Sequence, residues 1–252
     1  MFTLLQTYVD YNTVGSSGIM TDLSTGGSIV LMAIIGVVGY VVQARLQSVF
    51  KRYSQVVSPG AMTGAELAEK MLRDHGIHNV KVTHVKGHLT DHFNPQTMTV
   101  NLSDSVYASR SVAAAAVACH ECGHAVQHAV GYAPLRLRSQ LVPVVNFASK
   151  LSTWVILIGI AIMTATSSAL VCWIGVGMVA MSALFSIVTL PVEYNASDRA
   201  LEWLQRSGTL RGSEVDGARI SLRWAARTYL VAALSAIATI LYYIAMINSR
   251  RR

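Results

Sequence analysis

Charged residues are scarce in this chain of 252 residues. Asp, Glu, Lys and Arg make up 13% of it, against 52% hydrophobic residues. Soluble domains carry about 25% charged residues, so this deficit predicts a membrane protein. The net charge of +7 does not indicate nucleic-acid binding. The basic residues are scattered and form no patch interleaved with aromatic residues.

Cysteine is also rare, and the three cysteines exclude the disulfide framework of a small secreted protein. Cys119 and Cys122 form a C-x-x-C pair, which leaves a redox role open. Small buried residues of a helix are the simpler interpretation of that pair. Lys and Arg are missing from residues 1–44, so the N-terminus lacks the basic start of a cleavable signal peptide.

Four apolar runs approach or reach the length that crosses a bilayer. They are residues 28–45, 145–166, 168–190 and 229–247. The short polar link at Ser167 and Ser168 predicts that the second and third runs form a transmembrane hairpin. A polar N-terminal extension, residues 1–27, precedes the first run, and a basic tail, residues 248–252, follows the last one.

Basic residues concentrate in residues 46–140 and 191–228. By the positive-inside rule both segments face the cytoplasm and the N-terminus lies outside. Four spans would place the C-terminal arginines, residues 250–252, outside the cell, which conflicts with the rule. We therefore expect a multi-pass protein of the cell (inner) membrane with two cytoplasmic segments.

The segment 46–140 mixes helical and strand patterns. A capping box, Thr63 followed three residues later by Glu66, predicts the start of a helix. Hydrophobic periodicity predicts a helix over 64–75 and strands over 80–84 and 97–102. An Ala-rich run without proline, ended by Gly131, predicts a helix over 111–129. Residues 191–228 are helical again, and Pro191 is expected near the start of a helix.

His120 and His124 lie four residues apart in the predicted helix 111–129, so their imidazoles share one face. With Glu121 they form the pattern H-E-x-x-H, in which two histidines bind zinc and the glutamate is the general base. Zinc lowers the pKa of its bound water, and Glu121 accepts the proton and delivers it to the leaving amine. Two histidines satisfied by hydrogen bonds fit this apolar helix less well.

A catalytic zinc needs a third protein ligand. His128 lies about 12 Å from His120 along the helix axis, which is too far for both to bind one ion. Glu193 directly follows an apolar run, where a carboxylate is costly unless it is paired or bound to a metal. An ordinary first-turn glutamate, favoured by the helix dipole, explains Glu193 equally well on spacing alone.

Several segments resemble the YugP-type bacterial membrane zinc metallopeptidases, over about residues 46–247. They are L-T-D-H-F-N-P (89–95), A-x-H-E-x-G-H-A-x-Q-H (118–128), G-Y-A-P-L-R-L-R (131–138), L-V-P-V-V-N-F (141–147) and L-P-V-E-Y-N-A-S (190–197). This resemblance implies a mainly α membrane protein with about four transmembrane helices and a small α+β zincin-like cytoplasmic catalytic domain. It also implies that His120, His124 and Glu193 are zinc ligands and that Glu121 is the catalytic base, as in the similar membrane gluzincins.

The partners of the ligands depart from the gluzincin pattern. Many gluzincins carry, four residues after the ligand glutamate, an aspartate that orients a zinc-bound histidine. Here Ser197 stands at that position, as a weaker partner, and Asp198 comes one residue late. His92, beside Asp91, is a candidate donor to the developing oxyanion, although a turn residue is the simpler interpretation.

The sequence thus predicts an endopeptidase with one Zn²⁺ per chain, acting on protein or peptide substrates at the lipid bilayer. The alternative from another class is a catalytically weak or inactive zinc-binding scaffold that acts within a protein assembly. Glu121 favours the enzyme, because a structural zinc site needs no general base.

Overall fold

The computed structural model describes residues 2–60 and 62–249, with side chains from residue 26 onward. The chain divides into two compact units, which are described separately below. We call Met1–Gly39, Pro143–Phe185 and Val231–Arg252 the helical unit. We call Tyr40–Val142 and Ser186–Leu230 the mixed unit, because it holds the strands.

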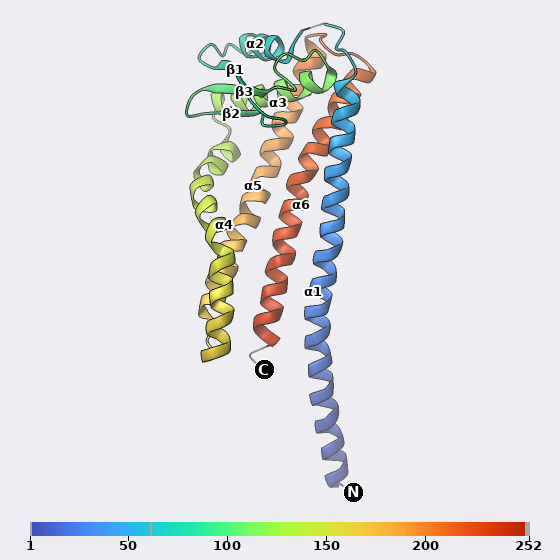
Figure 1. Ribbon diagram of the computed structural model, residues 1–252, viewed down its shortest axis with the longest axis vertical. Coiled ribbons are helices and arrows are strands. Elements are labelled where there is room, and N and C mark those ends of the chain that lie inside the picture. Colours follow the sequence, from blue (N-terminus) through green and yellow to red (C-terminus); the bar gives the residue numbers. More distant parts are fainter. Residues whose placement is uncertain (1, 61, 250–252) are drawn as a thin grey trace. The chain divides into compact units, whose positions relative to one another are not determined.

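Four long helices carry the apolar sequence (Figure 1). They are α1 (Phe2–Ser54), α4 (Ala133–Thr166), α5 (Leu170–Arg206) and α6 (Ser213–Ser249). Within the described residues, four stretches are long and apolar enough to cross a membrane, and each lies in one of these helices. The stretch in α1 is Gly26–Ser54. The protein is therefore mainly helical and membrane-spanning in composition, as the scarcity of charge predicts.

The helices are more continuous than the sequence predicts. The expectation that a helix begins near Pro191 is wrong, because α5 continues through this proline to Arg206. An internal proline costs about 3 kcal/mol through its missing N–H and its ring. Burial of Val192, Ala196 and Ala200 along one face of the same helix, each 0% exposed, offsets that cost. The end of the predicted helical region 191–228 and the last apolar run likewise form one helix, α6.

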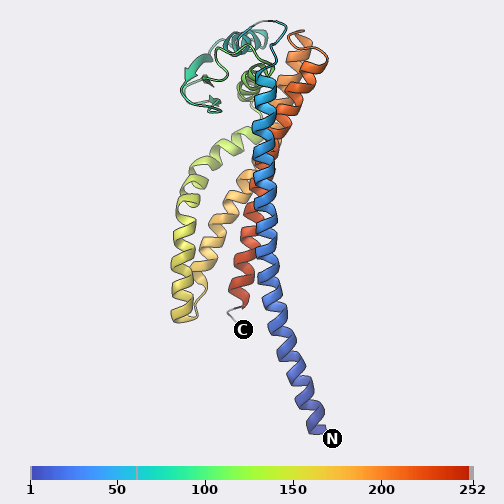
Figure 2. The same cartoon turned by 45° about the vertical axis from the view of Figure 1, so that its right-hand side comes forward.

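In the helical unit, α4 and α5 run side by side and are joined by a short turn (Figures 1 and 2). Their contact depends on glycine. A Cβ on Gly159 would lie 2.6 Å from the backbone nitrogen of Cys172, and one on Gly175 would collide with the side chain of Ile156. Small residues let helices approach closely where both are apolar, as in membrane bundles. This pair is the one for which the sequence predicts a transmembrane hairpin.

The mixed unit holds a three-stranded sheet in the order β1-β3-β2. β1 (Lys81–Val85) pairs in parallel with β3 (Thr99–Ser103), and β2 (His92–Asn94) pairs antiparallel with β3. The strand predictions over 80–84 and 97–102 are confirmed by β1 and β3. The sequence gives no sign of β2, because three residues before a turn are too few to show an alternating pattern. β2 is nevertheless the edge of the sheet that matters for the site.

Helices α2 (Gly64–Asp74) and α3 (Val112–Ala129) pack with this sheet around a common core. The predicted capping box begins α2: Thr63 Oγ1 accepts from the Glu66 amide at 3.2 Å, and the Glu66 carboxylate accepts from the Thr63 amide at 2.7 Å. The alanines of α3, residues 113–116, are 0% exposed and allow close packing on all sides. The core thus fixes α3, which corresponds to the helix predicted over 111–129.

Candidate metal centre

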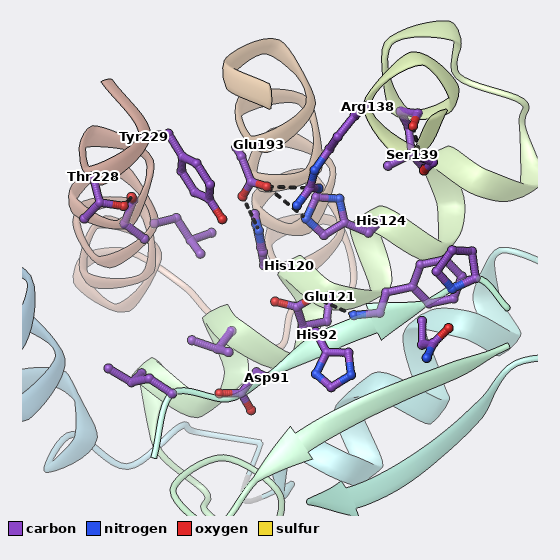
Figure 3. A pocket seen from close by; sticks show the side chains of 18 of the residues that line it. Asp91, His92, His120, Glu121, His124, Arg138, Ser139, Glu193, Thr228 and Tyr229 are labelled. Carbon is purple, nitrogen blue, oxygen red and sulfur yellow. Dashed lines mark hydrogen bonds and ion pairs between the residues drawn. The ribbon is translucent and has the colours of Figure 1, made fainter. Parts of the chain in front are cut away.

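His120 and His124 on α3 converge with Glu193 on α5 inside the mixed unit (Figure 3). His120 Nε2 lies 3.2 Å from Glu193 Oε2, and His124 Nε2 lies 3.7 Å from Glu193 Oε1. One ligand atom from each of the three residues lies within 4.8 Å of the others. Two imidazoles and a carboxylate form a donor set found in catalytic zinc sites, so the group fits the metal that the sequence pattern implies.

The approach of α3 to α5 depends on Gly123, the residue before His124. A Cβ at this position would lie 2.5 Å from the backbone oxygen of Ala196 on α5. Any side chain would therefore push the two helices apart. The glycine of the H-E-x-G-H segment thus allows ligands that are far apart in sequence to meet.

His124 is held in the tautomer that a metal requires. Gln127, fully buried one turn later, donates through Nε2 to the carbonyl oxygen of Val192 at 2.8 Å and to Asn195 Oδ1 at 3.0 Å. A carbonyl oxygen only accepts, so Gln127 must turn its own Oε1 toward His124 Nδ1, which lies 3.0 Å away. Nδ1 then carries the proton, which leaves the lone pair on Nε2 facing Glu193.

Ser197 lies 3.1 Å from His120 Nδ1 through its hydroxyl, the distance of a hydrogen bond. The sequence predicts this contact as a substitute for the aspartate of related sites. Asp198 is exposed and points away, into a separate cavity beside α5 and α6 that Ser197 also borders. The two ligand histidines thus receive their partners from a serine and a glutamine rather than from a carboxylate.

Arg138 of α4 and Tyr229 of α6 complete the surroundings of Glu193. Arg138 Nη1 lies 3.2 Å from Glu193 Oε1, forming an ion pair with a carboxylate that is 4% exposed. Tyr229 lines the same cavity, and its side chain points toward Glu193 in Figure 3. A buried carboxylate needs such partners to stay ionised.

Glu121 faces the same cavity and is anchored to the sheet edge. Its Oε2 accepts a hydrogen bond from the backbone amide of Phe93 in β2 at 3.0 Å. Burial raises the pKa of Glu121 to about 7, although the nearby His120 opposes that rise. A carboxylate with a pKa near neutrality can both take up and release a proton at physiological pH.

The two histidines differ in their affinity for protons. Burial, together with the neighbouring His120, lowers the pKa of His124 to about 4. Burial also acts to lower the pKa of His120, but the hydrogen bond with Glu193 and the charge of Glu121 outweigh it, so that pKa is raised. Neutral imidazole is the form that binds a metal. His124 can therefore bind an ion directly, whereas His120 releases a proton when the ion binds.

His92 lines the cavity from β2, but its ring is fully engaged. Nδ1 lies 2.9 Å from the Thr90 carbonyl oxygen, to which it must donate, and Nε2 lies 3.2 Å from Asn101 Nδ2. With Nδ1 as the donor and Nε2 as the acceptor, no ring N–H is left for a substrate. This geometry favours the turn role over the oxyanion role for His92.

Cys119 and Cys122 lie in the core of the mixed unit and are both 0% exposed. Burial raises the pKa of both thiols, and Cys122 Sγ contacts the carbonyl oxygen of Ala68. A buried thiol with a raised pKa is a poor nucleophile. The redox interpretation of the C-x-x-C pair therefore finds no support in their surroundings.

A cavity of about 540 Å³ opens onto these groups. Sites that bind small molecules span about 300–1,000 Å³, so this one has room for a stretch of peptide. Its walls are mostly apolar and come from α1, α4 and α6 as well as from β2. The apolar wall residues include Leu46, Phe50, Phe93, Val117, Leu135, Val142, Leu222 and Ala225.

Arg138, Gln127, Asn195 and Tyr229 were not recognised from the sequence as parts of the site. Three of them stand in segments that carry the family resemblance: 131–138, 118–128 and 190–197. Those shared segments were the available signal. Tyr229 stands at the start of an apolar run, where a tyrosine is typical of a membrane interface and signals nothing more.

Comparison with known proteins identifies the family. Residues 28–248 match a family described as "Putative neutral zinc metallopeptidase". The "Putative membrane protease YugP" of Bacillus subtilis (strain 168) is 40% identical over 204 residues, which cover 80% of this chain and 88% of that protein. No solved structure matches the chain. The chain therefore belongs to this family of neutral zinc metallopeptidases, and it is a zinc metallopeptidase whose described residues include four helices long and apolar enough to cross a membrane.

Proposed function

We propose that the protein is a zinc-dependent membrane endopeptidase that hydrolyses peptide bonds of membrane-associated or membrane-surface polypeptides. The observation that carries this proposal is the convergence of His120, His124 and Glu193 on the wall of a cavity that Glu121 also faces. The activity named for the family and for the Bacillus relative supports it.

His120, His124 and Glu193 would hold one zinc ion. When bound, zinc supplies a Lewis acid that activates a water molecule and polarises the substrate carbonyl. The protein prepares the site for this ion by fixing the tautomer of His124 through Gln127 and by placing Ser197 at His120.

Glu121 would act as the general base. It takes a proton from the attacking water, whose oxygen bonds to the carbonyl carbon. It then gives that proton to the amine that leaves when the C–N bond breaks. The hydrogen bond from Phe93 holds the carboxylate at the edge of the sheet, where a substrate backbone would lie.

β2 would bind the substrate as an added strand. It is an edge of the sheet, and its residues His92, Phe93 and Asn94 line the cavity. An extended peptide can pair with such an edge through its backbone. A helix with two ligand histidines beside an edge strand is the plan of a zincin-like catalytic domain, and we propose that residues 46–140 and 191–228 form such a domain.

The helices that form the cavity wall support the proposal that the substrates are membrane-associated. It is built partly from α1, α4 and α6, which also carry apolar stretches long enough to cross a membrane. We propose that the catalytic region faces the cytoplasm and that the protein is multi-pass in the cell (inner) membrane. The concentration of Lys and Arg in residues 46–140 and 191–228 supports this orientation.

Newly formed protein termini in cell membranes test this proposal. Membrane fractions from cells that express the wild-type protein should contain N-termini on membrane polypeptides that are missing when Glu121→Gln replaces it. The variant is a matched control, because it keeps the fold and differs in one terminal group. Identical sets of termini in the two fractions would contradict the proposal and favour the zinc-binding scaffold.

A further inference from the structure

The cavity contains several hydroxyl groups that are already engaged. Ser139 donates to the carbonyl oxygen of Leu135 at 2.9 Å, and Ser221 donates to that of Gly217 at 2.9 Å. Thr228 donates to its own helix in the same way. Each of these donors satisfies a helical carbonyl and is not directed at the ligand group.

Arg138 forms an ion pair with Glu193, and the side chain of Tyr229 points toward Glu193 in Figure 3. The side chains of Arg138 and Tyr229 differ in charge. Arg138 balances the charge of a carboxylate that is 4% exposed, and removing one partner of a buried ion pair is strongly destabilising. The phenol of Tyr229 is uncharged, so its hydroxyl can turn to a substrate oxygen and leave no charge uncompensated.

The position of Tyr229 relative to Glu121 completes the observation. Figure 3 shows Glu121 entering the cavity from α3 and Tyr229 entering it from α6, with Glu193 and His120 between them. Water attack on a peptide carbonyl needs a base near the water and a hydrogen-bond donor near the carbonyl oxygen, where negative charge develops. Glu121 supplies the first of these groups, and His92 has no ring N–H left to supply the second.

We propose that Tyr229 is a catalytic residue that donates a hydrogen bond to the carbonyl oxygen of the scissile peptide bond as that oxygen becomes negative. This inference rests on the proposed function. Tyr229 keeps its proton throughout, so the atoms and protons of the reaction balance with water and Glu121 alone. Arg138 is then a positioning residue that holds Glu193.

Tyr229→Phe tests the role, because it removes the hydroxyl and keeps the ring. We expect the zinc content to be unchanged, kcat to fall by about 10²–10³-fold and KM to stay nearly constant, since one donor is lost only from the transition state. The affinity for a peptide phosphonamidate, whose tetrahedral anionic group mimics the transition state, should fall by a similar factor. Binding of that inhibitor is measured on the zinc-loaded protein and needs no turnover.

Tyr242→Phe is the matched control. It removes the same hydroxyl from the same helix, outside the residues that line the cavity. We expect kcat, zinc content and phosphonamidate affinity to match the wild type.

Two results would overturn the role of Tyr229. The first is a Tyr229→Phe variant that loses zinc but keeps the wild-type kcat per bound zinc, which would make Tyr229 a holder of Glu193. The second is an unchanged affinity for the phosphonamidate. A wild-type protein that binds zinc yet cleaves nothing would instead overturn the proposed function, so the two failures are distinguishable.

Discussion

Glu121→Gln should retain zinc and lose peptide hydrolysis by about 10²–10⁴-fold, the usual contribution of a general acid–base group. Gln has nearly the same shape, and its side-chain oxygen can still accept the hydrogen bond that Phe93 donates to Glu121 at 3.0 Å. It cannot take up a proton from water at neutral pH. The fold and the three proposed ligands are therefore preserved while proton transfer is lost.

The measurement combines the zinc content and the initial rate of cleavage for the purified protein. Glu202→Gln serves as the control. Glu202 is exposed on α5, and its substitution changes the charge by the same amount away from the zinc ligands. A Glu121→Gln protein that loads with zinc and cleaves within a few-fold of the wild type would contradict the role of Glu121. Loss of zinc from this variant would show that Glu121 supports the metal and is not only a base.

Glu193→Ala should prevent tight zinc binding. The change removes the carboxylate that lies 3.2 Å from His120 Nε2 and 3.7 Å from His124 Nε2. It also leaves the guanidinium of Arg138 in the cavity with its ion-pair partner gone. Removing a group that is hydrogen-bonded to a metal ligand lowers metal affinity by about 10–100-fold. We expect the loss of the ligand itself to lower zinc affinity by more than this.

Competition with a chelator of known zinc affinity measures this loss. Glu202→Ala is the control, since it removes a glutamate from the same helix but outside the ligand group. A circular-dichroism spectrum should show that Glu193→Ala keeps its helices. A folded Glu193→Ala protein that binds zinc as tightly as the wild type would exclude Glu193 as the third ligand.

The spacing of His120 and His124 on one helix was predictable, because a pattern of residues four apart depends only on local geometry. Spacing alone does not decide whether Glu193 is a metal ligand, because α3 and α5 meet only through tertiary packing. Gly123 and Ala196 make this meeting possible, and neither has a recognisable role until the two helices are seen together.

The remaining features were hidden for similar reasons. β2 spans His92–Asn94, which is too short for a periodic pattern, yet it anchors Glu121 through Phe93. Pro191 suggested a helix start, because local preference disfavours an internal proline, but burial of one face of α5 overrides that preference. Tyr229 joins the site from α6, which is distant in sequence from α3, and Arg138 joins it from the first turns of α4.

Zinc titration of the metal-free protein tests the central claim most directly. Zinc is removed with a chelator, the protein is purified in detergent, and zinc is added back while binding and cleavage of a peptide are followed together. We predict that both signals rise in parallel and saturate at one zinc per chain, and that Glu193→Ala shows neither rise. Cleavage that persists in the metal-free protein, or a wild-type protein that binds no zinc, would contradict the assignment of this site as a zinc peptidase centre.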